Sequence, residues 1–211
     1  KEADVYPVVI LISNQETHKY QVSSKVMYNL EEIKTKNLIN SIQFTSDIYW
    51  DKYFFNPDVV NLIIKITSND KLISKFPNIL GAATVNEAYQ VKEVIKELEK
   101  EKKYFKFTNT GTIDPYKSLW GLKQTQYIKG NYHKPIVTKT DLDEINRTRT
   151  TQSSSPKLII AGMALRIEAF FDECGSYCAG KSTTIILGES QNLKTLTGII
   201  NSKLVSYWFS K

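Results

Sequence analysis

Apolar and polar positions alternate with different periods along the chain, and these changes divide it into segments. Apolar runs rich in β-branched residues at 5–12 and 18–23, separated by the polar letters SNQET, predict two strands joined by a turn. From Ser24 onward, VMYNLEEIKTKNLINSI carries apolar residues at a period of about 3.6, so we expect a helix there. A short helix is also expected in DVVNLIIKI, which follows an Asn-Pro turn signal and carries Asp58 in its first turn.

The middle of the chain is less regular. KLISKFPNILGAATVNEAYQV contains Gly81 and passes from helix-like to strand-like sequence, which indicates a loop leading into a strand. VKEVIKELEKEKKYFKF is highly charged and is typical of a solvated helix face. TKTDLDEINRTRTTQSSSPK is the least hydrophobic stretch. We expect a helix start there, capped by Thr140 or Asp141, that runs into an exposed loop rich in Ser and Thr.

The C-terminal part combines short strands with a helix. KLIIAG, LRIEAFFDE and STTIILG are strand-like runs separated by turn signals, and NLKTLTGIINSKLVSYWF has helical spacing. Helices mixed with short strands indicate the α+β class. Because two strands alone cannot hold a core, the first predicted hairpin should belong to another domain, with a boundary at about residues 20–30.

Composition limits the possible locations of the protein. The 211 residues are 41% hydrophobic and 24% charged, which are ordinary values for a globular domain. The longest apolar run, VYPVVILI, is too short to span a bilayer, and no cleavage-site pattern follows it. We therefore predict no membrane segment and no signal peptide, and we expect a cytoplasmic location. The chain begins without Met and ends on SYWFSK, which favours a piece of a longer protein.

Charge and cysteine content permit several functions. The net charge of +6 is compatible with a polyanionic partner and equally with an ordinary Lys-rich surface. Cys174 and Cys178 lie far in sequence from both histidines, so too few ligands are present for a zinc site. Two unpaired thiols, buried or half-buried, are expected.

One motif points to nucleotide chemistry. GSYCAGKSTT, residues 175–184, matches G-x-x-x-x-G-K-S, the Walker A pattern. That motif needs a helix to begin directly after Lys181, because the helix N-terminus and the loop amides hold the phosphates. The following letters, STTIILG, are β-branched and apolar, which favours a strand. We therefore expect a β-hairpin, with LRIEAFFDE, a turn over Cys174–Ser176, and YCAGKSTTIIL returning.

No catalytic constellation is visible in the sequence. Paired carboxylates such as Asp172-Glu173 lie in turn-like segments, where a role in forming the turn accounts for their presence. Basic residues instead alternate with aromatic and hydroxyl residues around 116–134, 147–152 and 166–184. These residue types contact DNA phosphates and base edges, and they equally form plain surface. The candidate DNA contacts are Tyr116, Trp120, Lys129, Arg147, Arg149, Gln152, Arg166, Lys181, Ser182 and Thr183.

The order of several short motifs resembles a known family. PKLIIAGMALRIEAFFDECGSYCAGKSTTIIL followed by LKTLTGIINSKLVSYWF is similar to the TaqI-like target-recognition domain of adenine-N6 DNA methyltransferases, as found in type IIG restriction-modification enzymes. The family helix L-x-x-L-x-G-x-L-N-S-K-L reads LKTLTGIINSKL, with Ile200 in place of the usual Leu. ILGAATVNEAYQV and FTNTGTIDPYKSLWG look like the family patterns G-x-x-T-x-x-N-x-A-F and x-T-G-x-I-x-x-Y. EADVYPVVILISN looks like the last strands of the preceding methyltransferase domain.

The resemblance implies a DNA-binding module that is separate from its catalytic domain. It places terminal methyltransferase strands at 1–23 and a target-recognition domain, truncated at its C-terminus, at 24–211. The family's catalytic N-P-P-[YF] tetrad is absent, so this chain is expected not to be an enzyme and to carry no metal or cofactor of its own. S-adenosylmethionine, adenine methylation and any DNA cleavage would belong to the parent protein. Arg166 matches the family's basic position after the small-residue loop.

The expected partners are double-stranded DNA and the covalently linked methyltransferase domain, with no membrane. Two other functions stay open. One is a protein–protein interaction module that docks through aromatic residues such as Trp120. The other is a P-loop-like nucleotide binder that uses Lys181.

Overall fold

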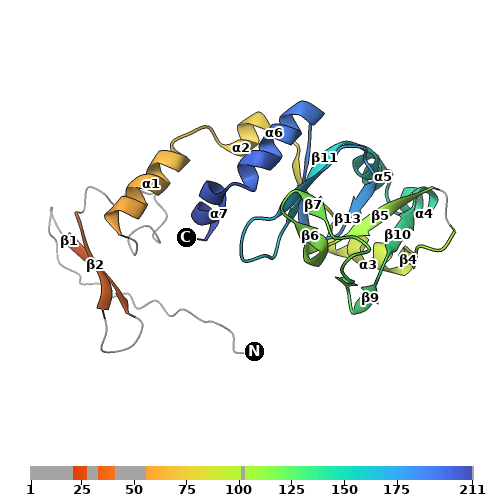
Figure 1. Ribbon diagram of the computed structural model, residues 1–211, viewed down its shortest axis with the longest axis horizontal. Helices are drawn as coiled ribbons and strands as arrows, with labels where there is room; N and C mark the ends of the chain where they lie inside the picture. The colour runs from red at the N-terminus through yellow and green to blue at the C-terminus, as the bar shows by residue number, and fades with distance from the viewer. Residues whose placement is uncertain (1–20, 28–32, 41–55, 101–102, 211) are drawn as a thin grey trace. The chain divides into compact units, whose positions relative to one another are not determined.

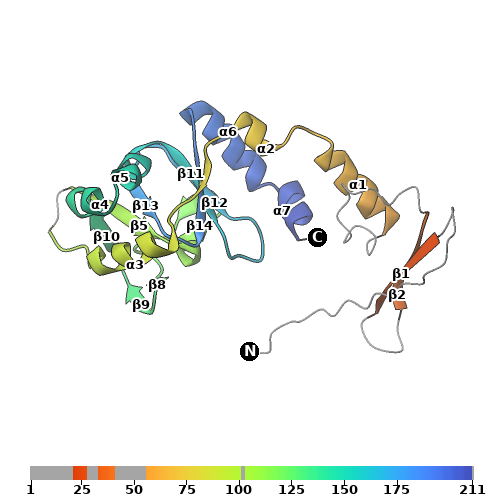
Figure 2. The ribbon, with the colours of Figure 1, turned by 180° about the vertical axis from the view of Figure 1, so that it is seen from behind.

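A computed structural model describes residues 21–27, 33–40, 56–100 and 103–210 (Figures 1 and 2). The chain divides into two compact units, Lys1–Asn69 and Asp70–Lys211. The predicted α+β class is confirmed, because helices are mixed with several small sheets of short strands. The boundary expected at about residues 20–30 falls inside the first unit, and the assignment of 1–23 to a methyltransferase domain stays a prediction. The strand predicted at 5–12 lies outside the described residues, as does the first half of the one predicted at 18–23, while residues 21–23 are in a strand as predicted.

The described part of the first unit contains a hairpin and a helix. Strand β1 (Gln21–Met27) pairs antiparallel with β2 (Ile33–Asn40). The helix predicted from Ser24 onward is therefore wrong. Short apolar runs fit both periods, and here strand pairing decided between them. The helix predicted after the Asn-Pro signal is confirmed as α1 (Pro57–Thr67), where the Asn56 side chain accepts a hydrogen bond from the Asp58 N–H.

Two four-stranded sheets form the framework of the described part of the second unit. The first has the order β13-β5-β10-β4 and the second the order β12-β11-β14-β3. Neighbouring strands are antiparallel, except for the parallel pair β13–β5. The first sheet contains β4 (Lys96–Glu97), β5 (Tyr104–Thr108), β10 (Pro135–Thr138) and β13 (Tyr177–Ala179). The second contains β3 (Ile79–Gly81), β11 (Lys157–Ala161), β12 (Ala169–Asp172) and β14 (Thr183–Leu187).

Hairpins and helices complete this unit. The hairpins are β6 (Ile113–Asp114) with β7 (Lys117–Ser118), and β8 (Thr125–Tyr127) with β9 (Gly130–Tyr132). The helices are α2 (Leu72–Lys75), α3 (Val85–Val94), the 3₁₀ turn η3 (Thr110–Thr112), α4 (Lys139–Ile145), α5 (Arg147–Ser154), α6 (Ser190–Ile200) and α7 (Lys203–Phe209). None of the helices in the described part of the chain combines the length and the apolar content that a bilayer crossing demands.

Strand β11 lies at the centre of the second sheet, and both of its faces are buried. Leu158 packs in one cluster with Leu193 of α6, while Ile159 packs in another with Ile185. This period of two explains why KLIIA reads as an uninterrupted apolar run. A third cluster joins the first sheet to α3 and α4 through Phe107 and neighbouring apolar residues. Figure 1 shows α6 beside the second sheet and α3 and α4 beside the first.

The strands around the Walker-like segment, residues 175–184, were predicted correctly, but the strands with which they pair were not. β12 and β14 both pair with β11, and β13 leaves this sheet to pair with β5. The expected hairpin between LRIEAFFDE and YCAGKSTTIIL is therefore wrong. The turn after β12 depends on Gly175, which has a φ of +61° and passes the end of α5 so closely that a Cβ would lie 2.2 Å from the Ser154 carbonyl oxygen.

In KLISKFPNILGAATVNEAYQV the short helix α2 precedes strand β3, but the strand expected after the loop at Gly81 is wrong. Helix α3 follows Gly81 instead. The helix begins with a capping box: the Thr84 hydroxyl accepts from the Glu87 N–H at 3.3 Å, and the Glu87 carboxylate accepts from the Thr84 N–H at 2.8 Å. The charged helix predicted downstream ends at Val94, because the chain then enters β4 and β5.

Candidate nucleic-acid interface

The Walker-like segment does not have the geometry of a nucleotide site. Its letters form strand β13, a turn over Gly180–Ser182 and strand β14. A strand begins after Lys181, as predicted, so no helix N-terminus faces this turn from the following element. The motif therefore lacks the feature that would hold a nucleotide phosphate.

Three separate turns meet at Ser182. The Thr110 hydroxyl, in η3, donates a hydrogen bond to the Ser182 carbonyl oxygen at 2.6 Å. The Gly162 N–H, at the start of the β11–β12 loop, donates to the same oxygen at 2.9 Å. We call this region, residues 110–123, 162–168 and 180–182, the turn surface. It unites segments that are up to about 70 residues apart in sequence, and Figure 2 shows β11, β12 and β14 side by side behind it.

A groove of about 430 Å³ crosses the turn surface. One wall is the β11–β12 loop, and the other includes Thr110, Gly111, Ile113 and Lys123. The groove combines apolar side chains with exposed basic ones, which is the mixture found where proteins contact nucleic acids.

Arg166 stands beside this groove and is exposed over 59% of its side chain. Its Nε donates to Glu168 Oε1 at 3.2 Å, and its Nη2 lies 3.6 Å from Asp114 Oδ1. Such exposed ion pairs contribute at most about 1 kcal/mol, so they orient the guanidinium and can still be exchanged for another anionic partner. Its remaining donors can reach a phosphate, because an arginine carries more N–H groups than these two carboxylates use. The structure thus joins Arg166 to the β6–β7 hairpin.

Tyr116 occupies the turn of that hairpin with an unusual backbone. Its φ is +69°, a left-handed conformation that favours Gly or Asn, and its side chain is 60% exposed. The Tyr116 N–H donates to the Ala169 carbonyl oxygen at 2.9 Å, which fixes the turn onto β12. A large exposed aromatic at such a position is consistent with a function that keeps it there.

The predicted contact segment 147–152 is helical, and Arg149, Thr150 and Gln152 are turned inward while its other residues are exposed. The interpretation as an exposed loop is wrong: the residues form α5, and the Asn146 side chain accepts from the Thr148 N–H at 2.9 Å. Arg149 and Gln152 point inward, since Arg149 Nη1 donates to Gln152 Oε1 at 2.6 Å and also to the Ala82 carbonyl oxygen. We therefore assign both to an internal structural role, whereas Arg147 is exposed.

The partner of Arg149 is a carboxylate that sequence reasoning missed. Arg149 Nη2 lies 2.8 Å from Glu87 Oε2, and Arg149 Nε donates to Glu87 Oε1 at 3.2 Å. The guanidinium, aided by the helix cap at Thr84, holds the pKa of Glu87 at about 2, although burial acts in the opposite direction. The letters TVNE contained the signal, because Thr followed three residues later by Glu is the capping-box pattern.

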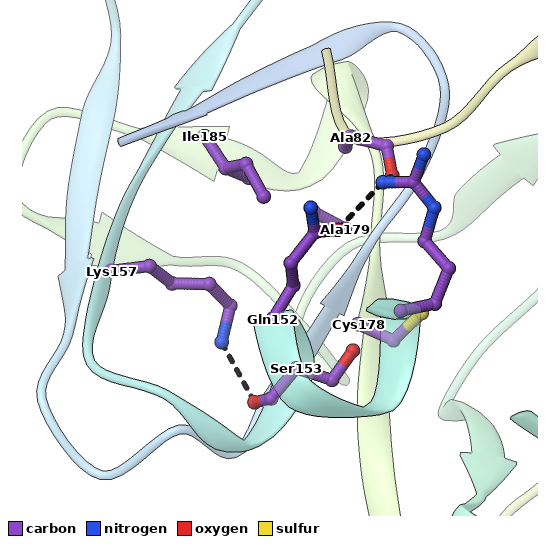
Figure 3. Close-up of a pocket in the computed structure, with 8 residues that line it drawn as sticks. Ala82, Gln152, Ser153, Lys157, Cys178, Ala179 and Ile185 are labelled. Atoms are coloured by element: carbon purple, nitrogen blue, oxygen red, sulfur yellow. Dashed lines mark hydrogen bonds between the residues drawn. The ribbon is translucent and has the colours of Figure 1, made fainter. Parts of the chain in front are cut away.

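A small enclosed cavity of about 10 Å³ lies behind this network (Figure 3). It has room for no more than about one water molecule, so it is no ligand site. One of its lining residues, Lys157, has a side chain that is only 1% exposed, and its Nζ lies 2.5 Å from Asp172 Oδ2. Burial lowers the pKa of Lys157, and the Asp172 carboxylate opposes that shift.

The cysteines have no role in the turn surface. Both are unpaired, as predicted, with Cys174 exposed and Cys178 buried. Burial raises the pKa of the Cys178 thiol, so it is held in its unreactive form.

Three further candidates are tied to neighbouring groups. Trp120 Nε1 donates to the Pro135 carbonyl oxygen at 2.7 Å, and the Lys106 ammonium lies 5.2 Å from the centre of its ring. Thr183 is buried and donates its hydroxyl to the Gly180 carbonyl oxygen at 2.7 Å. Ser182 is partly buried and donates its hydroxyl to Asn109 Oδ1. These contacts shape the turns, while the adjacent Lys181 is exposed.

Lys129 lies on a different hairpin, in the turn between β8 and β9. Ile128 and Lys129 both have positive φ, +40° and +61°, where Asn-Gly is the usual pair. We expect Lys129→Gly to raise the free energy of unfolding by about 1 kcal/mol, because glycine removes the left-handed strain. Urea denaturation followed by circular dichroism measures this. Lys117→Gly, in strand β7, is the control and should lower stability; a loss for Lys129→Gly as well would contradict the strain argument.

Sequence reasoning did not single out the apolar members of the turn surface. Met163 and Leu165 are exposed beside Arg166, but in the sequence they belong to an ordinary turn-like segment between two predicted strands. No hydrophobic periodicity in the sequence marks these two residues as exposed. Only the folded loop shows which of its side chains face solvent. Comparison with known proteins adds no further assignment: no protein-family model matches the chain, and no curated protein matches it.

Proposed function

We propose that this chain recognises double-stranded DNA, as the target-recognition domain of an adenine-N6 DNA methyltransferase of the TaqI-like kind. The observation that carries the proposal is the turn surface, where Arg166 and Lys123 line one groove and Lys181 is exposed in the adjoining turn. The order of sequence motifs supports the same function. Methylation, and the S-adenosylmethionine that it consumes, would belong to a linked methyltransferase domain, and the module would act in the cytoplasm.

The chemistry of the turn surface suits a duplex better than a small anion. The basic residues come from different turns and are spread over a surface, as successive phosphates of a DNA strand require. The exposed Tyr116 adds a hydroxyl group and an aromatic ring that can contact sugar, phosphate or base edges. The rigid sheets behind the turns supply the fixed spacing on which recognition depends.

We expect Arg166→Gln and Lys181→Gln each to weaken duplex binding several-fold and to reduce the slope of log K against log salt by about one, because each removes one phosphate contact. Fluorescence anisotropy with a labelled synthetic duplex at several salt concentrations measures both quantities. Lys194→Gln is the matched control, because this exposed lysine lies on α6, outside the turn surface, and pairs with Glu173 at 3.4 Å. Unchanged affinity and slope in both variants would show that the turn surface does not bind DNA.

A further inference from the structure

The tip of the β11–β12 loop presents apolar side chains to solvent. Leu165 is fully exposed at 101% and Met163 is 74% exposed, although neither belongs to a core cluster. Single exposed apolar residues are common on protein surfaces, but here two lie within three residues of each other at the end of one protrusion. They also line the groove of the turn surface.

The loop is held in this shape by its base and by its alternate residues. The Ala161 N–H donates to the Glu168 carbonyl oxygen at 2.9 Å and closes the base. Gly162 lies so close to the neighbouring turn that a Cβ would lie 2.5 Å from the Ser182 carbonyl oxygen. Ala164 and Ile167 pack against the core clusters on the two sides of β11. Because Ala164 and Ile167 face the core, Leu165 and Arg166 between them face solvent, and the tip needs little ordering upon binding.

The surroundings of the tip identify its partner. Arg166 is the next residue after Leu165, Lys123 stands on the facing wall of the groove, and Lys181 follows the glycine of the adjoining turn. An apolar tip flanked by basic side chains complements a duplex, whose base stack is apolar and whose edges carry phosphates. The two nearby acids, Asp114 and Glu168, are paired with Arg166.

Resting on the proposed function, we infer that Met163 and Leu165 form a wedge that enters a groove of the duplex and opens one base step. The flanking Arg166 holds an adjacent phosphate while the wedge is inserted. Apolar wedges of this kind unstack neighbouring bases and kink the DNA. Because unstacking is easier where pairing is already weak, the protein should prefer a duplex that contains a mismatch.

The test compares a fully paired synthetic duplex of mixed sequence with the same duplex carrying one mismatched pair. The wild-type chain should bind the mismatched duplex about tenfold more tightly, because part of the unstacking cost is already met. Met163→Ser/Leu165→Ser should lose this preference and keep the salt slope of the wild type. Arg166→Gln should show the reverse, with a lower slope and an unchanged preference. Ile199→Ser is the control, because it removes an exposed apolar side chain on α6, outside the turn surface.

Each outcome separates the wedge from the proposed function. DNA binding without any mismatch preference, or a preference that survives in the double serine variant, overturns the wedge alone. Failure of the wild-type chain to bind any duplex overturns the proposed function and the wedge with it, and makes the apolar tip a protein contact. Circular dichroism of the double variant checks its fold, which should be unchanged because both side chains are exposed.

Discussion

Asp172→Asn is expected to lower the free energy of unfolding by about 3–5 kcal/mol, the largest single effect that we predict. The Asp172 carboxylate accepts hydrogen bonds from Lys157 Nζ and from the backbone N–H groups of Ser176 and Tyr177. The change removes the negative charge, so the buried Lys157 ammonium keeps only neutral acceptors, among them the carbonyl oxygens of Ser153 and Ser155. An uncompensated buried charge is far more costly than a missing surface pair. Urea or thermal denaturation at neutral pH measures the loss.

Two further variants isolate the charge as the cause. Glu173→Gln removes the next carboxylate, which is 58% exposed and pairs with Lys194, so its effect should stay within about 1 kcal/mol. Lys157→Met/Asp172→Asn removes both charges, and the amide can still accept from Ser176 and Tyr177. This double variant should recover most of the stability, because methionine has a volume similar to that of lysine and leaves no buried charge. A double variant as unstable as Asp172→Asn would mean that the carboxylate acts through its turn contacts instead.

Arg149→Met is expected to destabilise the protein by several kcal/mol, whereas Arg147→Met should change stability by less than about 0.5 kcal/mol. The two arginines are two residues apart on α5, which makes them a matched pair. Arg149 pairs with the largely buried Glu87 and bonds to Gln152 and Ala82, while Arg147 is exposed. Equal losses in the two variants would refute the internal role that we assign to Arg149.

The same ion pair predicts an acid-dependent stability. The pKa of Glu87 falls from 4.5 to about 2 in the folded protein, so its contribution is fully present above pH 4.5 and is lost as the pH falls through about 2. In Arg149→Met the strongest cause of that shift is gone. The difference in unfolding free energy between wild type and variant should therefore shrink as the pH falls from 4.5 toward 2. Denaturant titrations at several pH values test this, with Glu93→Gln, exposed on α3, as the control.

The local sequence was sufficient to predict the type of element wherever a single hydrophobic period dominated a segment. KLIIA and TTIIL are β-branched and apolar, and both are strands, β11 and β14. LKTLTGII keeps helical spacing and is a helix, α6. The strand after Lys181 alone was enough to reject the Walker A geometry. The Asn of the family-like helix motif also has a structural reason, since Asn201 bonds to both the N–H and the carbonyl oxygen of Ala169.

Predictions were wrong where two local interpretations competed. The segment after Ser24 fits both periods, and pairing with a second strand made it part of a hairpin. RTRTTQSSS has low helix propensity, yet it is helical because Asn146 caps it and because its Thr150, Gln152 and Ser153 are buried against the fold. Tertiary burial thus overrode propensity at the point where the sequence suggested a flexible loop.

By itself, the sequence determined the α+β class, the main C-terminal strands and helix, and the residue types available for binding DNA. These follow from short-range periods, which act within one element. Only the tertiary structure decided that β11 separates β12 from β14, that Arg149 is internal while Arg166 is exposed, and that three distant turns meet at Ser182. Strand partners and burial depend on contacts between segments far apart in the chain, and no local pattern specifies them.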